Sequence, residues 1–245
     1  MEPPAVGGGG GSHYYVALPD PRFKPRALAD LVVNVALAAA RQTSSDRSGS
    51  IARGETNRKP AVVAVVVVRD ARDGVDDAVE DIARAGKDVA RVDDRADVVV
   101  ASLRADQPPG DRADALERFR AARRREDGET FSTTFARGGV FALVTSEACL
   151  PSPGAGEGAL GASLVINMET PKSREAYARR TRAGLGGGGR AGGGGGGGGV
   201  VLNVIAPHQL SALRAVLPDG VALDAMPIDL IDTLAADVAA GGRER

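Results

Sequence analysis

Two stretches of the sequence carry side chains that could bind a phosphate or a nucleic acid. Thr145 ends the apolar run 140–145, and a hydroxyl at the carboxyl end of a buried strand is typical of ligand sites in α/β proteins. The segment 172–182 is basic: from Lys172 to Arg190 the chain has six positive residues and one negative residue. Both features have a simpler interpretation, in which Thr145 only ends a strand and the cations form a solvated helix face.

The other reactive side chains lack the neighbours that catalysis or metal binding requires. Cys149 is the only cysteine, and its nearest candidate base in the sequence is Glu147, whereas a catalytic cysteine needs a histidine. His13 and His208 are far apart and have no carboxylates near them in the sequence. The eight glycines at 192–199 do not form a phosphate loop, because such loops space their glycines for specific turns. We therefore expect no catalytic residue and no metal site in this chain.

The composition limits the possible classes of protein. The 245 residues have a net charge of -1 and a pI near 6.2, so any nucleic-acid surface must be a local patch. A single cysteine excludes an internal disulfide and suits a reducing compartment. No apolar run is long enough to cross a membrane, and the first residues lack the pattern of a secretory signal. We expect an intracellular protein of the nucleus, the cytoplasm or an organelle.

Short apolar runs alternate with amphipathic stretches along the chain. The short apolar or alternating runs predict strands at 61–68, 98–103 (preferred to 89–92), 140–145, 163–167 and 200–206, with an edge strand at 13–18. Apolar spacing of three and four residues predicts helices at 26–41, 73–85, 112–125, 172–182, 207–216 and 230–240, with Gly86 ending the second of them. This alternation predicts an α/β domain, with about five core strands in a parallel sheet and helices on both faces.

Polar and glycine-rich segments lie between these elements, where loops tolerate extra length. We expect one domain from residue 13 to residue 240, preceded by a flexible leader at 1–12. Four stretches are expected to be polar or glycine-rich insertions in this domain: 42–59, 126–139, 151–162 and 183–199.

Several of these pieces, in this order, resemble one protein family. They are HYYVALPDPRFKPRALADLV from residue 13, the apolar strand 61–68, GDRADALERFR at 110–120, LVTSE at 143–147, SLVINMETPKSREAYARR at 163–180 and VVLNVIAPHQLSALRAV from residue 200. From about residue 13 to residue 217, the chain is similar to the second, C-terminal RecA-like domain of the DEAD-box RNA helicases (superfamily two). The resemblance implies a three-layer RecA-like fold, in which a parallel sheet lies between two layers of helices.

The resemblance also implies roles for individual residues. Thr145, with Ser146 beside it, occupies the place of a loop that contacts the RNA backbone. Arg112 is similar to an arginine that contacts or positions an RNA phosphate. Arg180 lies where the first arginine that reaches the γ-phosphate of ATP would be, and Arg182 or Arg190 could substitute for a second one.

The chain departs from the family's pattern at both places. The loop after Thr145 lacks Arg-Gly-x-Asp, and the segment after Tyr177 lacks the family's histidine and its arginine spacing. No G-x-x-x-x-G-K-[ST] and no Asp-Glu-x-Asp occur, so the sequence offers neither that phosphate cradle nor those Mg²⁺ ligands. In the family these motifs belong to a first lobe. We expect ATP and Mg²⁺ to bind only if a first lobe is supplied.

These observations predict a degenerate helicase C-terminal domain. It would bind single-stranded RNA through the backbone, or dock on a helicase or ribonucleoprotein, without ATPase activity of its own. Two alternatives stay open. The chain could be a fragment or subunit of an active ATP-dependent RNA helicase, or a structural α/β module that makes only protein–protein contacts.

Overall fold

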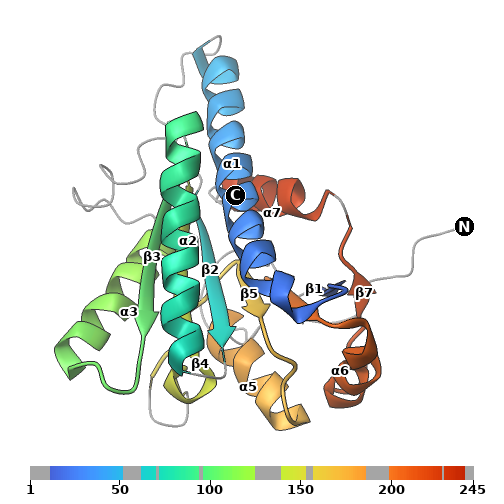
Figure 1. Ribbon diagram of the computed structural model, residues 1–245. Helices are drawn as coiled ribbons and strands as arrows, with labels where there is room; N and C mark the ends of the chain where they lie inside the picture. Colours follow the sequence, from blue (N-terminus) through green and yellow to red (C-terminus); the bar gives the residue numbers. More distant parts are fainter. Residues whose placement is uncertain are drawn as a thin grey trace, which may run out of the picture.

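A single sheet organises the part of the chain that the computed structural model describes, residues 12–51, 62–69, 72–93, 96–124, 139–152, 157–185, 199–227 and 229–240 (Figure 1). Its seven strands have the order β3-β4-β2-β5-β6-β1-β7, and all neighbouring pairs are parallel. They are β1 (Ser12–Ala17), β2 (Val62–Arg69), β3 (Asp97–Leu103), β4 (Gly139–Ser146), β5 (Leu164–Asn167), β6 (Val200–Ile205) and β7 (Asp224–Ala225).

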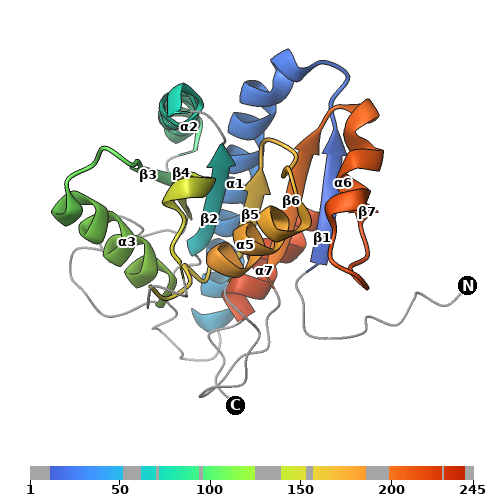
Figure 2. The same ribbon diagram turned by 90° about the horizontal axis from the view of Figure 1, so that it is seen from below.

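Helices cover both faces of this sheet (Figure 2). One face packs against α1 (Lys24–Ile51), α2 (Arg72–Val92) and α7 (Leu230–Ala240), and the other against α3 (Pro109–Arg124), α5 (Arg174–Leu185) and α6 (Leu210–Val216). Successive side chains of a strand point to opposite faces. Thus Val65 and Val67 of β2 belong to the core that includes α1, α2 and α7, whereas Val66 and Val68 belong to the core that includes α3, α5 and α6. The predicted α/β class, with helices on both faces of a parallel sheet, is confirmed.

Two helices run more than one turn beyond the end that the sequence pattern predicts. The predicted end of the second helix at Gly86 is wrong, because α2 continues to Val92 and contains the strand-like run 89–92. Gly86 marks a close contact instead of a terminus: a Cβ there would lie 2.8 Å from Cβ of Val98 in β3. The preference for 98–103 as the next strand is confirmed.

The first helix shows the same behaviour. It extends to Ile51, so residues 42–51 of the expected insertion 42–59 are helical. No proline follows Pro25 in this helix, and adding a turn to an existing helix costs much less than starting one. The other parts of the expected leader and insertions that lie outside the described residues are 1–11, 52–59, 126–138, 153–156 and 186–198.

The described ends of two expected insertions are packed against each other. Leu160 and Ala162 donate backbone hydrogen bonds to the carbonyls of Ala183 and Gly184 at 2.8 Å each. Residues 183–185 form the last part of α5.

At the other side of the sheet, β1 is not the edge strand that its pattern suggests, because the two-residue strand β7 pairs with it. Among the described residues, no helix is both long and apolar enough to cross a membrane.

A glycine in α5 gives a direct test of how closely this helix packs on the sheet. A Cβ at Gly184 would lie 2.4 Å from Cγ2 of the buried Val165, whose branched side chain has little rotamer freedom. Gly184→Ala is expected to lower the free energy of unfolding by about 1 to 2 kcal/mol in urea denaturation. Gly110→Ala is the control, because no atom lies within 4 Å of a Cβ there and alanine favours the helix. Equal stabilities of the two variants would contradict the close contact.

Candidate functional site

The carboxyl ends of the strands lie at one edge of the sheet, because the strands are parallel. Loops and first helical turns follow at this edge, which is the usual ligand site of an open α/β sheet. Four residues that the sequence singles out have their side chains or strand ends here: Arg112, Thr145, Ser146 and Arg180. Arg182 lies apart from them.

Arg180 is buried in an ion pair at this edge. Its side chain is 1% exposed, and Nε and Nη2 lie 2.9 and 2.8 Å from Oε2 of Glu147. Its Nη1 donates to the backbone carbonyl of Glu169 at 2.9 Å. Helical side chains lean toward the N-terminus of their own helix, so Arg180 reaches back from α5 to the segments that follow β4 and β5. The guanidinium therefore ties two strand ends together.

Arg180 and Arg182 point in different directions. Positions two residues apart in an α-helix are separated by about 200° around its axis. Arg182 is exposed, and its Nε donates to the carbonyl of Ala178 in the same helix at 3.2 Å. The structure does not bring the two arginines to one point, and the charge of Arg180 is already compensated by Glu147. As placed, these residues do not fit a site for the γ-phosphate of ATP.

The three residues predicted to contact RNA lie close in the fold but differ in accessibility. Thr145 is 0% exposed, and its hydroxyl donates to the carbonyl of Ser146 at 3.1 Å. Ser146 is half-buried and begins the short 3₁₀ turn Glu147–Cys149. Arg112 donates from Nη2 to the carbonyl of Cys149 at 2.8 Å. Thr145 therefore supports the loop from inside, and Arg112 and Ser146 are the members of this group with exposed surface.

The charges around Arg112 limit its value as a phosphate contact. Its Nη2 lies 4.0 Å from Oε1 of Glu157, and 23% of its side chain is exposed. Arg104, at the end of β3, is similarly paired with Asp76 at 2.8 Å. An RNA phosphate at this place would have to compete with carboxylates that are already present.

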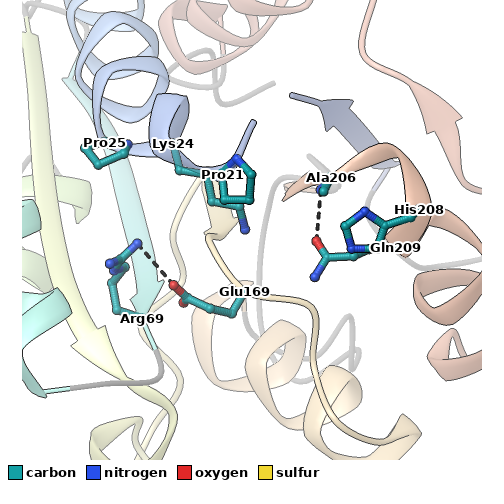
Figure 3. A pocket seen from close by; sticks show the side chains of 8 residues that line it. All are labelled: Pro21, Lys24, Pro25, Arg69, Glu169, Ala206, His208 and Gln209. Carbon is teal, nitrogen blue, oxygen red and sulfur yellow. Dashed lines mark hydrogen bonds and ion pairs between the residues drawn. The ribbon is translucent and has the colours of Figure 1, made fainter. Parts of the chain in front are cut away.

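A cavity of about 300 Å³ opens at the same edge (Figure 3). It lies among the ends of β2, β5 and β6 and the start of α1. Its walls are formed by Pro21, Lys24, Pro25, Arg69, Glu169, Ala206, His208 and Gln209. An ion pair joins two of these residues, with Nη1 of Arg69 3.1 Å from Oε1 of Glu169. We refer to this hollow as the edge pocket.

Glu169 connects the edge pocket to the buried pair. Its carboxylate faces Arg69, while its backbone carbonyl accepts a hydrogen bond from Arg180. Met168 directly precedes Glu169, and its backbone carbonyl accepts a hydrogen bond from Nζ of Lys24, the first residue of α1. The segment after β5 is thus held by cations from three different elements.

A second polar cluster is buried between α5 and the sheet. Nδ1 of His13 and the hydroxyl of Tyr177 share a hydrogen bond of 2.7 Å, and Nδ2 of Asn203 lies 3.5 Å from that hydroxyl. Asn203 accepts from Nδ2 of Asn167, its register partner in β5, at 2.9 Å. Burial lowers the pKa of His13. Burial also raises the pKa of Tyr177 to about 12, against a smaller opposite effect of Asn203.

Sequence reasoning missed the partners at this edge, although a signal for them exists. Arg69 ends β2, Glu147 directly follows β4 and Glu169 comes two residues after β5. Each is a charged residue placed next to an apolar run, at strand ends that must meet in a parallel sheet.

Among the described residues, no group of three or more His, Cys, Asp or Glu side chains is placed to hold a metal ion.

Comparison with known proteins identifies the fold. No family model matches the chain, and a search of curated proteins also finds no match. A solved structure of S. cerevisiae Dbp5, a DEAD-box helicase, bound to RNA and ADP BeF3, matches with a TM-score of 0.51 and 12% sequence identity. The chain has an α/β RecA-like fold. The match covers 96% of this chain and 46% of the Dbp5 chain, so this chain spans about half of that protein's length.

At 12% identity the likeness shows the fold alone. It agrees with the three-layer RecA-like architecture that the resemblance implies. Roles of individual residues have to be argued from their placement in this chain.

Proposed function

We propose that the chain is an RNA-binding RecA-like module that has no ATPase activity of its own. Two observations support the proposal: the fold is that of a helicase whose solved structure contains RNA, and α5 presents a cluster of exposed cations. The second observation carries the argument, because it concerns residues of this chain.

Four cations of and just before α5 are exposed to solvent. Lys172, Arg174, Arg179 and Arg182 are all exposed, and we call them the α5 surface. Glu175 is the exposed acidic residue among them, so four positive charges and one negative charge give a net charge of +3. In contrast, the net charge of the whole chain is -1. A local cationic surface on a nearly neutral protein is what backbone contacts to RNA require.

The α5 surface is better suited to phosphates than the edge beside β4. Arg179 and Arg182 are three residues apart and therefore share one side of the helix. Arg174 has one exposed partner, Asp219, at 2.8 Å. Exposed pairs of this kind are weak and exchange readily for other anions. Arg112 and Ser146 are proposed to add contacts at the neighbouring strand ends, and the buried Thr145 is not included.

The proposed lack of ATPase activity is supported by sequence and geometry together. The sequence lacks the phosphate-cradling motif, and Arg180 is engaged by Glu147 inside the protein. Phosphoryl transfer depends on charges that are positioned at the phosphate itself. The purified chain is expected to release no phosphate from ATP above background.

Filter binding to single-stranded RNA tests the α5 surface. The double variant Arg179→Gln/Arg182→Gln is expected to bind roughly three- to tenfold more weakly at about 100 mM salt, because two phosphate contacts are lost. The slope of log affinity against log salt should fall by about 1.4, since each contact to single-stranded nucleic acid contributes about 0.7.

The matched control removes the same charge from the opposite layer of helices. Arg84 and Arg91 are 64% and 78% exposed and belong to α2, which packs on the other face of the sheet. Arg84→Gln/Arg91→Gln should leave both affinity and slope nearly unchanged. An equal loss in both variants would mean that only net charge matters. No binding even at low salt would reject the RNA proposal and favour a module for protein contacts.

A second candidate function is half of an ATP-dependent helicase. The observation that favours it is the coverage of 46% of the Dbp5 chain, because the family's ATP site forms between two lobes. ATP turnover that appears only on adding a separately expressed first lobe would support this candidate. Turnover by the chain alone would contradict both proposals.

A further inference from the structure

The edge pocket is lined by a mixed set of charges that the RNA proposal does not use. Two cations, Lys24 and Arg69, and one carboxylate, Glu169, face a space of about 300 Å³ together with His208 and Gln209. With histidine neutral, two positive charges and one negative charge leave the wall with a net charge of +1. A volume at the low end of the range for ligand pockets suits a small molecule or one unit of a larger one.

We propose that the edge pocket binds a phosphoribosyl group, with the phosphate at Lys24 and Arg69 and the ribose hydroxyls at Glu169. The site would take a sugar phosphate or a mononucleotide. This proposal does not depend on RNA binding at the α5 surface, which involves other residues.

The phosphate is assigned to the side of the pocket nearest α1. Lys24 is the first residue of this 28-residue helix, whose N-terminus contributes a partial positive charge to the same region. Arg69 is held in place by its hydrogen bond from Nε to the carbonyl of Gly74, at 3.1 Å. Only 19% of the Arg69 side chain is exposed, so its charge is less screened by water than that of a surface arginine. Arg69 and Lys24 line the same pocket, and together they favour a phosphate, which has to compete with Glu169 for Arg69.

The carboxylate determines which kind of anion fits. Glu169 repels a bare anion, but an ionised carboxylate accepts hydrogen bonds from hydroxyl groups. In dinucleotide-binding folds an acidic residue plays this role toward ribose. Gln209 has its amide oriented by the backbone N–H of Ala206, which donates to Oε1 at 2.9 Å. A ligand that carries a phosphate and neighbouring hydroxyls satisfies both sides of the pocket.

The turn that walls the pocket also carries an exposed aromatic ring. Phe23 lies between Pro21 and Lys24 in this turn, and 53% of it is exposed. Phe23 does not line the pocket, but it directly precedes Lys24 in the chain, and an exposed aromatic ring can stack on a nucleobase. A mononucleotide should therefore bind more tightly than ribose 5-phosphate, and Phe23→Ala should remove this difference only.

Titrations followed by amide NMR shifts test the proposal on the wild-type chain. Ribose 5-phosphate is expected to shift the amide signals of Glu169 and His208 with a dissociation constant on the order of 1 mM, as its small size allows. Ribose and inorganic phosphate should each bind more weakly. No shift with ribose 5-phosphate at 10-fold that concentration, or equal binding of ribose, would overturn the proposal.

Three variants separate the two halves of the site. Lys24→Met should weaken ribose 5-phosphate roughly tenfold, because a charged hydrogen bond is lost. Arg26→Met is the matched control: it removes an 85% exposed charge from the same helix and should change affinity less than about twofold. Glu169→Gln should weaken ribose 5-phosphate while inorganic phosphate binds equally or more tightly. Parallel losses for both ligands in Glu169→Gln would contradict the assignment of the hydroxyls.

Oligonucleotides distinguish a free ligand from the end of an RNA chain. If a 5′-phosphorylated RNA shifts the same pocket signals and its 5′-hydroxyl form does not, the phosphoribosyl group is supplied by RNA. If neither shifts them while ribose 5-phosphate does, the ligand is a free small molecule. Both results support the site. If none of these ligands shifts the pocket signals of the wild-type protein, the proposal is rejected.

Discussion

Glu147→Ala is expected to lower the free energy of unfolding by roughly 3 to 5 kcal/mol in urea denaturation, because it removes the carboxylate partner of a buried guanidinium. Arg180 is 1% exposed, and its Nε and Nη2 lie 2.9 and 2.8 Å from the accepting Oε2 of Glu147. Without Glu147 the guanidinium loses the negative charge of this carboxylate, and the carbonyl of Glu169 is a neutral acceptor. An arginine cannot avoid this cost by losing its proton.

The opposite single variant should be less damaging. In Arg180→Met the remaining carboxylate of Glu147 is 27% exposed and can regain water, and methionine retains much of the apolar stem. The double variant Glu147→Ala/Arg180→Met should be more stable than Glu147→Ala alone, because it no longer buries a charge. Simple addition of the two single effects would show that the pair is not coupled.

An exposed ion pair of the same helix is the control for this cycle. Arg174 pairs with Asp219 at 2.8 Å, but the two side chains are 49% and 91% exposed. Asp219→Ala is expected to cost less than about 1 kcal/mol. Similar losses in Asp219→Ala and Glu147→Ala would mean that burial does not determine the strength of the Arg180 pair.

The sheet could be predicted because its signal is local. Runs of at least three consecutive apolar residues define β2, β4, β5 and β6, and a parallel sheet buries both faces of such strands. The two-residue strand β7 has no comparable signal. It exists because β1 offers it a free edge, which is a property of the assembled sheet.

The prediction of a helix boundary was wrong where the glycine contacts a strand residue that is distant in sequence. Gly86 resembles a helix terminus by its residue type, but its role is to let α2 approach Val98. Gly184 lets α5 approach Val165 in the same way. A glycine selected for lack of volume cannot be distinguished from a glycine selected for backbone freedom without the neighbouring strand.

The candidate site shows the same limit. Residue types at strand ends predict which edge of the sheet is polar, and Arg112, Ser146 and Arg180 do meet there. The sequence does not reveal that Arg180 is turned inward, because this depends on Glu147, which lies 33 residues away in the chain. Because Arg180 is buried in the ion pair, it has a structural role. The accessible positive charge of α5 comes from its exposed cations on the outer side of the helix.

Tyr177 allows the second buried cluster to be measured by pH. Its side chain is fully buried against His13 and Asn203, and burial raises its pKa from 10.0 to about 12. Between these two values, the unfolded chain loses the phenolic proton while the folded protein keeps it. The folded state then binds more protons than the unfolded state, so stability falls as pH rises through this window.

The loss attributable to Tyr177 should reach roughly 2 to 3 kcal/mol by pH 12, since each pKa unit corresponds to about 1.4 kcal/mol. Other groups titrate over the same range, so the measured quantity is the difference between wild type and Tyr177→Phe in urea denaturation at each pH. This difference should be largest near pH 9 and shrink toward pH 12. Tyr15→Phe, which changes a partly buried tyrosine of β1, is the control for loss of a tyrosine hydroxyl. A difference that stays constant from pH 9 to pH 12 would show that the Tyr177 hydroxyl ionises as readily in the folded protein as in the unfolded chain.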